Sequence, residues 1–108
     1  MREERHWTAK QEDVRVDYRF VKEGGEVVYF SINVSIVGKE DPEDVYRVDT
    51  AHGYLHEQRF WRSNEPTPIP EERFASYSHA FLYYRKEVAR NFITWSELYK
   101  AQAAGKGD

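Results

Sequence analysis

Apolar and polar residues alternate along two neighbouring stretches near the start of the chain. Every second side chain is Val, Tyr or Phe in residues 14–20, and Val, Phe or Ile in residues 28–36. Gly24 and Gly25 lie between the two stretches. A period of two residues is the pattern of a half-buried β-strand. The two stretches therefore predict a β-hairpin.

The register of this hairpin follows from the need to keep one face apolar. A loop of residues 24–26 pairs Phe20 with Phe30, whereas a two-residue turn pairs Phe20 with Tyr29 and mixes polar and apolar side chains on each face. We therefore predict the longer loop. Its register gathers polar side chains on the opposite face, namely Arg15, Asp17, Arg19, Ser31, Asn33 and Ser35.

A second hairpin is predicted after the turn at residues 38–44. Strand-like stretches run over residues 45–51 and 54–62, and His52 and Gly53 separate them. Gly adopts positive φ angles freely and His tolerates them, so these two residues fit a tight hairpin turn.

The last third of the chain predicts one long helix. Residues 63–70 contain three prolines, which cannot continue a sheet. Large apolar side chains then recur at spacings of three and four residues, which is typical of one helical stripe. The stripe consists of Phe74, Tyr77, Phe81, Tyr84, Val88, Phe92, Trp95 and Tyr99. With two acidic residues suited to the positive end of a helix, it predicts a helix over residues 71–104.

This helix is too long for the sheet that it covers. A straight helix over residues 71–104 spans about 51 Å, whereas a strand of about nine residues spans about 30 Å. The helix therefore breaks near Thr94, which has capping-box spacing with Glu97, or its C-terminal part packs on a second copy.

Together the elements predict an α+β domain. It consists of a four-stranded antiparallel meander sheet with a long C-terminal helix packed on one face, because each apolar surface needs the other for cover. Residues 1–12 are polar and aperiodic and are expected to be a flexible lead-in. Residues 13–104 form the single domain, and residues 105–108 are expected to fray.

Composition narrows the class of protein. The 108 residues include six Phe, three Trp and eight Tyr, so the core is expected to be built largely from rings. The absence of Cys excludes disulfides, thiolate zinc sites and thiol nucleophiles. No apolar run is long enough for a membrane span, so we expect a cytoplasmic protein without a membrane partner. The net charge of −3 argues against a general phosphate-binding coat but permits a local basic patch.

The sheet face away from the helix is the candidate functional surface. On it, the second hairpin places Asp49 directly across from His56, with Arg47 on the same face. A carboxylate beside an imidazole orients the ring as an acid or base, and a guanidinium can hold a phosphate. His56, Asp49 and Arg47 are therefore candidate catalytic residues of a metal-independent ribonuclease. The alternative is an ordinary cross-strand ion pair on a solvated face.

Four further residues are candidates for substrate binding: Arg15, Arg19, His52 and Phe60. The two arginines suit phosphate groups, and Phe60 is a ring at a polar position of its strand. Exposed rings beside arginines stack on unpaired RNA bases. The surplus rings Phe60, Trp61, Trp95 and Tyr99 are alternatively core residues or a dimer seam.

A metal site would draw on His52, His56 and Asp49. The predicted turn separates the two histidines, so we expect no metal, and no other cofactor is expected.

The segment from Tyr46 to His56 resembles a group of small prokaryotic proteins similar to the TumE-like toxins of toxin–antitoxin pairs. The shared features are an aspartate, an Ala-His-Gly-like turn and a second histidine on a short sheet. Asp49, His52, Gly53 and His56 are the matching positions. The resemblance covers about residues 45–62 and implies an RNA-directed toxin activity with an antitoxin protein as partner.

The predicted function is thus a toxin-like, RNA-acting protein, in its strongest form a metal-independent endoribonuclease. The expected partners are RNA, an antitoxin protein and a second copy of the chain. The alternative is a non-catalytic, homodimeric protein-interaction module.

Overall fold

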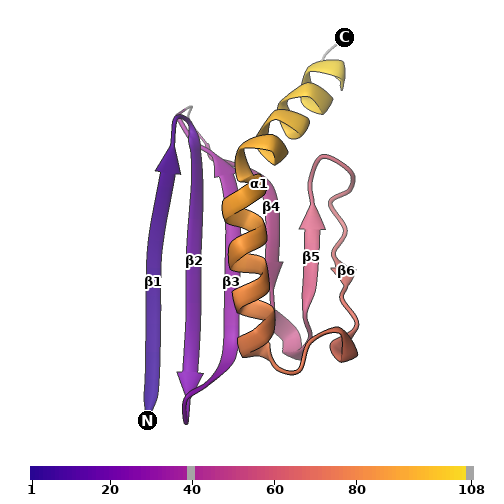
Figure 1. Cartoon of the computed structure of the whole chain (residues 1–108). Helices are drawn as coiled ribbons and strands as arrows, with labels where there is room; N and C mark the ends of the chain where they lie inside the picture. The colour runs from indigo at the N-terminus through magenta and orange to yellow at the C-terminus, as the bar shows by residue number, and fades with distance from the viewer. Residues whose placement is uncertain (39–40, 107–108) are drawn as a thin grey trace.

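The computed structural model, which describes residues 1–38 and 41–106, has two layers: an antiparallel sheet and one long helix packed across it (Figure 1). Neighbours in the sheet are neighbours in the chain. The six strands are β1 (Arg2–Gln11), β2 (Val14–Glu23), β3 (Glu26–Ile36), β4 (Glu43–Asp49), β5 (His56–Arg59) and β6 (Thr67–Pro68). Two short 3₁₀ turns, η1 (Ala51–Gly53) and η2 (Glu71–Arg73), precede the helix α1 (Tyr77–Lys106).

The α+β class, the antiparallel meander and the C-terminal helix are confirmed, but the prediction of four strands was wrong. The strand missed at the start is β1, where a flexible lead-in was expected over residues 1–12. Of its ten residues, only Trp7 is half-buried, and the others are exposed. Neither face therefore shows an apolar period. β1 is held instead by full pairing with β2 and by Trp7, whose ring stacks on Tyr18 at 5.0 Å.

The second missed strand is β6, which lies in the proline-rich segment. It is only two residues long and pairs with the start of β5, with His56 opposite Pro68. Proline lacks a backbone N–H and is tolerated at such an edge, where no further strand needs that donor.

The first hairpin has the predicted register, reached by a different turn. Phe20 lies opposite Phe30, and Val14 lies opposite Ile36. The turn consists of Gly24 and Gly25 alone, both with positive φ, instead of a three-residue loop. The pairing then shifts by one residue between Val21 and Lys22, so a β-bulge supplies the extra residue.

The second hairpin also has the predicted register, but β4 begins and ends two residues earlier than the predicted stretch 45–51, and β5 is shorter than the predicted stretch 54–62. β4 ends at Asp49 and β5 begins at His56, instead of continuing to residues 51 and 54. The intervening turn contains His52 and Gly53, whose φ angles of 66° and 82° both lie in the left-handed region. Gly53 donates its N–H to the carbonyl of Thr50 at 3.3 Å.

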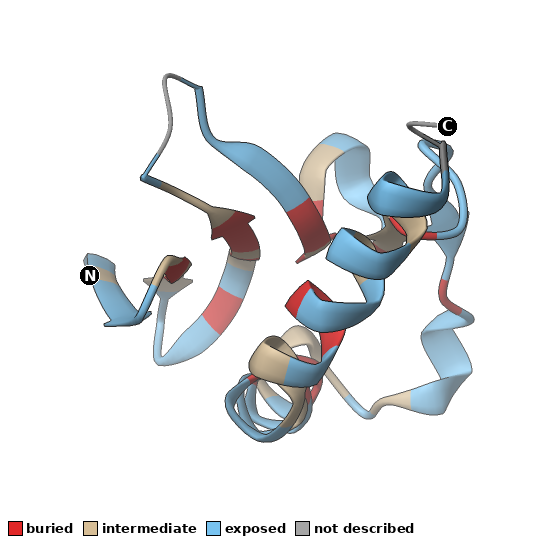
Figure 2. Cartoon of the chain, turned by 90° about the horizontal axis from the view of Figure 1, so that it is seen from above, coloured by how far each residue is buried: buried red, intermediate tan, exposed pale blue. Residues whose placement is uncertain are grey.

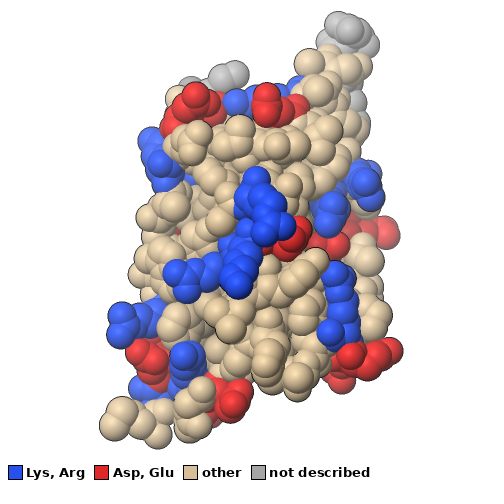
Figure 3. Space-filling model, viewed as in Figure 1, with Lys and Arg blue, Asp and Glu red and all other residues tan. Residues whose placement is uncertain are grey.

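The core lies between α1 and the sheet and is rich in rings, as predicted. α1 packs mainly on β3 and more lightly on β2 and β4. Seen from above, its buried positions face the sheet (Figure 2). Within the predicted stripe, Phe81, Tyr84, Val88 and Trp95 are buried, and Phe74, Tyr77, Phe92 and Tyr99 are partly buried against the core. The outer surface of α1 carries Arg85, Lys86 and Arg90, and Lys and Arg side chains gather there (Figure 3).

The helix does not break at Thr94. α1 is continuous, but it bends in its second half and passes beyond the end of the sheet (Figure 1). The Ser96 hydroxyl donates to the carbonyl of Ile93 at 2.7 Å, a contact that often accompanies helix bending. Lys100 ties this part to Asp13 in the β1–β2 turn at 2.9 Å. Of the expected frayed tail, residues 105–106 belong to α1, and residues 107–108 lie outside the described residues.

Among the described residues, no helix is both long enough and apolar enough to cross a lipid bilayer.

Candidate functional site

The sheet surface opposite α1, called the open face below, carries two rows of polar side chains. The strand register aligns the residues across neighbouring strands. One row contains His6, Arg19, Ser31, Asp49 and His56, and the next contains Thr8, Asp17, Asn33, Arg47 and Gln58. The prediction that Arg47, Asp49 and His56 share a face with Arg19 is therefore confirmed.

Asp49 and His56 are in direct contact, and both are buried. Nε2 of His56 lies 2.8 Å from Oδ1 of Asp49, and the side chains are 9% and 3% exposed. The sequence predicted the contact but placed it on a solvated face. Burial makes it more than an ordinary surface ion pair, because a buried charge without a partner is costly.

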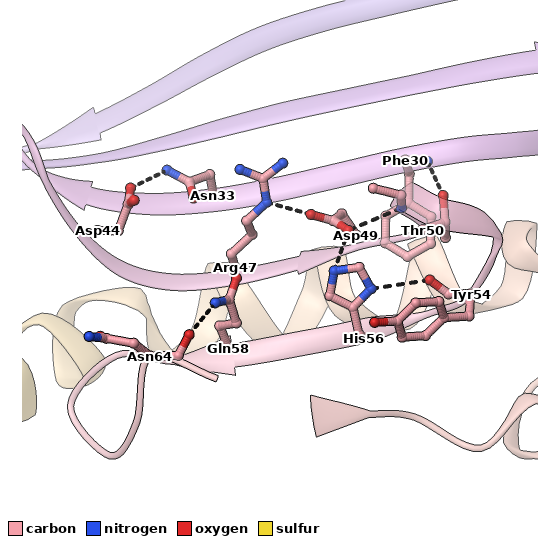
Figure 4. Close-up of polar contacts among 11 residues, drawn as sticks. Phe30, Asn33, Asp44, Arg47, Asp49, Thr50, Tyr54, His56, Gln58 and Asn64 are labelled. Carbon is pink, nitrogen blue, oxygen red and sulfur yellow. Dashed lines mark hydrogen bonds and ion pairs between the residues drawn. The ribbon is translucent and has the colours of Figure 1, made fainter. Parts of the chain in front are cut away.

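Asp49 is the centre of a small hydrogen-bond network (Figure 4). Besides His56, its carboxylate accepts hydrogen bonds from the Nε of Arg47 and from the backbone N–H of Ala51, the latter at 3.1 Å. The carboxylate thus has three hydrogen-bonding partners. This network fixes the end of β4 to the turn that follows it.

The imidazole of His56 is engaged at both nitrogens. Nδ1 lies 3.2 Å from the carbonyl oxygen of Tyr54, and the Tyr54 ring packs over the imidazole at 4.7 Å. Because the carbonyl and the Asp49 carboxylate are both acceptors, a ring with protons on both nitrogens satisfies both contacts, and a neutral ring satisfies only one. In this arrangement neither ring nitrogen is free for a further contact, and His56 holds the Asp49 carboxylate in position.

Arg47 is the member of the network that reaches solvent. Its side chain is 41% exposed, and Figure 4 shows its two terminal nitrogens directed away from Asp49. Burial disfavours the charge of Arg47, but the hydrogen bond to Asp49 and the negative charge of that carboxylate outweigh it and raise the pKa of Arg47. The guanidinium is therefore held at Nε and keeps two outward donor groups.

These donor groups border a hollow in the open face. The hollow is lined by His6, Asp17, Arg19, Ser31, Asn33 and Arg47. Arg19, a predicted substrate-binding residue, thus shares a hollow with Arg47. It makes no ion pair with the described residues, and its guanidinium lies over the Tyr29 ring at 5.4 Å from the ring centroid.

The other predicted substrate-binding residues lie outside this hollow. Arg15 donates to Asp17 at 2.9 Å. His52 is exposed in η1. Phe60 follows β5, is half-buried, and donates its backbone N–H to the carbonyl of Val45 at 3.1 Å.

The sequence interpretation missed His6 as a site residue because residues 1–12 were not expected to form a strand. Once β1 is in place, its even-numbered residues fall on the open face, and His6 lies opposite Arg19. The sequence of β1 carries no periodic apolar signal that would have found it, because only Trp7 of this strand is half-buried.

Two of the surplus rings belong to the core. Trp95 is 7% exposed and stacks on Tyr46 at 4.2 Å and on Trp61 at 6.0 Å. Trp61 is 9% exposed. Of the three uses considered for these rings, the core is the one confirmed for this pair.

Within residues 1–38 and 41–106, no three His, Asp or Glu side chains are grouped so as to hold a metal ion. His52 is exposed in its turn, whereas Asp49 and His56 are buried in contact with each other.

Comparison with known proteins gives one match. A family model described as a domain of unknown function, DUF7718, matches residues 1–104. No curated protein and no solved structure matches the chain. The matched range contains the six strands of the described sheet and α1 as far as residue 104.

Proposed function

Since the chain belongs to the DUF7718 family, whose description names no activity, we propose a function from the open face: a toxin-like, RNA-acting protein that holds RNA phosphate groups through Arg47 and Arg19. One observation carries the proposal. The Arg47 guanidinium is fixed at Nε by the buried Asp49 and keeps two donor groups toward a solvent-facing hollow.

A guanidinium held in this way suits a phosphate. Its planar fork matches two phosphate oxygens, and fixing it in advance reduces the entropy that binding would cost. Asp49 and His56 are then positioning residues, because they act on the phosphate only through Arg47. Their burial supports this role, since it keeps water from competing for the carboxylate.

The other side chains that line the hollow favour RNA as the ligand over a simple inorganic anion. Ser31 and Asn33 offer a hydroxyl and an amide beside the two arginines, and such groups hydrogen-bond to ribose 2′-hydroxyls and base edges. The lining contains one carboxylate, that of Asp17, which already accepts hydrogen bonds from Arg15 and Thr8.

RNA cleavage is a second, stronger form of the proposal. The contact of an imidazole, a carboxylate and a guanidinium favours it, because these groups provide a base, an orienting group and a cation for the phosphorus centre. In this mechanism His56 is a neutral imidazole, and the ribose 2′-hydroxyl attacks the adjacent phosphorus and transfers its proton to the free ring nitrogen. The bond from phosphorus to the 5′-oxygen breaks, this oxygen takes that proton from the imidazolium, and a 2′,3′-cyclic phosphate forms. His56 must exchange one of its present hydrogen bonds to take part.

Binding is tested by fluorescence anisotropy with a labelled single-stranded RNA. We expect Arg47→Ala to weaken binding about tenfold or more, and Arg47→Lys to recover part of it, because Lys restores the charge without the fork. The matched control is Lys86→Ala/Arg90→Ala, which removes two charges from the outer surface of α1 (Figure 3). If this control loses binding and Arg47→Ala keeps it, the open face is not the RNA site.

Cleavage is tested on the same RNA in the presence of a chelator. The stronger form predicts fragments with 2′,3′-cyclic phosphate ends from the wild type and none from His56→Ala. If the wild-type protein binds the RNA and leaves it intact, the endoribonuclease proposal is wrong and the binding proposal stands.

The resemblance to toxins adds an antitoxin protein as a proposed partner. Expression of the wild type in a bacterial host should slow growth, and Arg47→Ala should restore it. A small open reading frame beside that of this chain, whose product abolishes the effect, would identify the partner. Equal growth with both variants, together with no RNA binding, would favour the alternative of a non-catalytic, homodimeric interaction module.

A further inference from the structure

The two edges of the sheet differ in how they are protected. At one edge, β6 is two residues long and contains Pro68, so it offers little backbone for pairing. At the other edge, β1 is a regular ten-residue strand without proline. Figure 1 shows β1 outermost in the sheet, away from α1, and in the described part of the chain no strand pairs with its outer side.

An edge strand of this length presents a row of unpaired N–H and C=O groups, which is a template for another strand. Charged side chains usually protect such edges. In β1 the charged side chains are arranged so that two antiparallel copies of the strand can place opposite charges across from each other. The charges therefore favour a second copy of β1 as the partner.

A two-fold axis that pairs β1 with a second β1 in antiparallel fashion runs perpendicular to the sheet. Residues opposite each other then point to the same face, so the sum of their numbers is even. When Trp7 faces Trp7 of the second copy, Glu4 lies opposite Lys10, and by symmetry this pair occurs twice. Opposite charges across strands stabilise pairing. Among the described residues Lys10 makes no ion pair, and Glu4 makes only an exposed contact with Arg2 at 3.3 Å, so both side chains can reach this contact.

Neighbouring registers are unfavourable. Centring the axis on His6 places Arg2 opposite Lys10, and centring it on Arg5 places that arginine opposite its own copy. Centring it on Thr8 places His6 opposite Lys10. Like charges directly opposite each other destabilise a strand pair, and within β1 the register centred on Thr8 gives no opposite-charge pair. Of these four registers, only the one centred on Trp7 combines two opposite-charge pairs with no like-charge pair.

We propose that two copies of this chain join through β1 in an antiparallel, two-fold symmetric pair centred on Trp7, which forms one continuous sheet. Trp7 is already held against Tyr18 and Phe81 and is only half-buried, so its remaining exposed surface meets the same ring of the second copy. Both helices then lie on one side of the joined sheet, and both open faces lie on the other.

This assembly would bring the two hollows together. His6 lines each hollow, and in the proposed register it lies opposite Thr8 of the second copy. The hollows would therefore become one symmetric polar surface across the axis. The assembly itself does not depend on the RNA proposal, because it follows from the edge and its charges.

Sedimentation equilibrium of the full chain tests the proposal through charge reversal. We expect the wild type to dimerise, Glu4→Lys and Lys10→Glu each to raise the dimer dissociation constant at least tenfold, and the double variant Glu4→Lys/Lys10→Glu to recover the dimer. Glu3→Lys is the matched control, since Glu3 would face the uncharged Gln11. Circular dichroism verifies that each variant is folded. A monomeric wild type, or a double variant as monomeric as the single ones, would overturn the proposal.

Cysteine cross-linking tests the register, and the absence of native Cys makes it clean. In the proposed register, residues 6 and 8 of the two copies are opposite each other. His6→Cys/Thr8→Cys should therefore form covalent dimers on oxidation or with a short thiol cross-linker, and neither single variant should do so. A dimer that forms without this cross-link would show that another surface, such as the end of α1, joins the copies, and would overturn the β1 proposal.

Discussion

Nε2 of His56 lies 2.8 Å from Oδ1 of Asp49, and the two side chains come from neighbouring strands yet are almost completely buried. A buried polar contact of this kind gives little net stability, because removing the two groups from water costs about as much as their attraction returns. Its presence here is better explained by what it supports. The second oxygen of Asp49 holds Arg47, whose outward donors border the hollow in the open face.

Removing one partner of this contact should destabilise the fold strongly, and removing the second partner as well should add little to that loss. We expect Asp49→Ala and His56→Ala each to lower the free energy of unfolding by about 3 to 5 kcal/mol, because each leaves a buried group without its partner. The double variant should cost clearly less than the sum of the single ones. Urea unfolding measures all three. Additive losses would mean that the two side chains do not support each other.

The contact itself was predictable from the sequence, but its burial was not. Alternation fixes which face a strand residue occupies, and the His52-Gly53 turn fixes the register, so Asp49 had to lie opposite His56. A period of two residues says nothing about what covers a face. Here the Tyr54 ring packs over the imidazole, and this contact comes from residues outside the strands.

The same limit explains the strand count. Sequence patterns report strands through the apolar side chains that they bury, and β1 buries little beyond Trp7. Its pairing with β2 depends on backbone hydrogen bonds and on polar contacts such as Thr8 to Asp17, which leave no periodic signal. The helix, by contrast, was predicted as one long element because its ring stripe faces the core along most of its length, but its start was wrong: it was predicted at residue 71, where the structure has η2, and α1 begins at Tyr77.

Trp95 is expected to stabilise the fold rather than a dimer contact. Its ring stacks on Tyr46 and Trp61 in the core, so Trp95→Ala should lower the free energy of unfolding by about 3 to 5 kcal/mol. Leu98→Ala is the matched control on the same part of α1, because Leu98 is 46% exposed, and it should change stability by less than about 0.5 kcal/mol. Thermal unfolding at two protein concentrations distinguishes the two roles. If Trp95→Ala only changes the concentration dependence, the ring is an interface residue.

Arg59 should contribute through the rings that surround it. Its guanidinium lies 5.9 Å, 5.8 Å and 5.7 Å from the ring centroids of Tyr46, Trp61 and Trp95, and it donates to Glu57 at 3.3 Å. We expect Arg59→Met, which keeps most of the stem, to lower the free energy of unfolding by about 1 to 2 kcal/mol.

The control for this cluster is Arg85→Met. Arg85 is exposed and lies over a single ring, Trp7, at 5.2 Å, so its replacement should cost about 0.5 kcal/mol or less. If both variants lower the free energy of unfolding in urea by the same amount, then contact with several rings does not increase the contribution of an arginine to stability.

The buried tyrosines predict a loss of stability in alkaline solution. Burial raises the pKa of Tyr84 to about 12, and burial also raises the pKa of Tyr46 and Tyr18. In the unfolded chain these hydroxyls ionise near their ordinary pKa of about 10. Between these values the unfolded state holds fewer protons than the folded state, so stability falls as the pH rises. The contribution is complete below about pH 10 and is lost as the pH passes about 12.

Tyr84→Phe isolates one of these groups, because it removes the ionising hydroxyl and keeps the buried ring. The variant should lose less stability than the wild type between about pH 9 and about pH 11, measured as the difference between urea unfolding free energies at the two values. Tyr83→Phe is the matched control. Tyr83 neighbours Tyr84 on α1, its ring lies 5.0 Å away, and it is 38% exposed. A wild-type pH dependence in Tyr83→Phe and a reduced one in Tyr84→Phe would assign the alkaline loss to the buried hydroxyl. The reverse result would contradict this assignment, because it would place the responsible ionisation on the surface of α1.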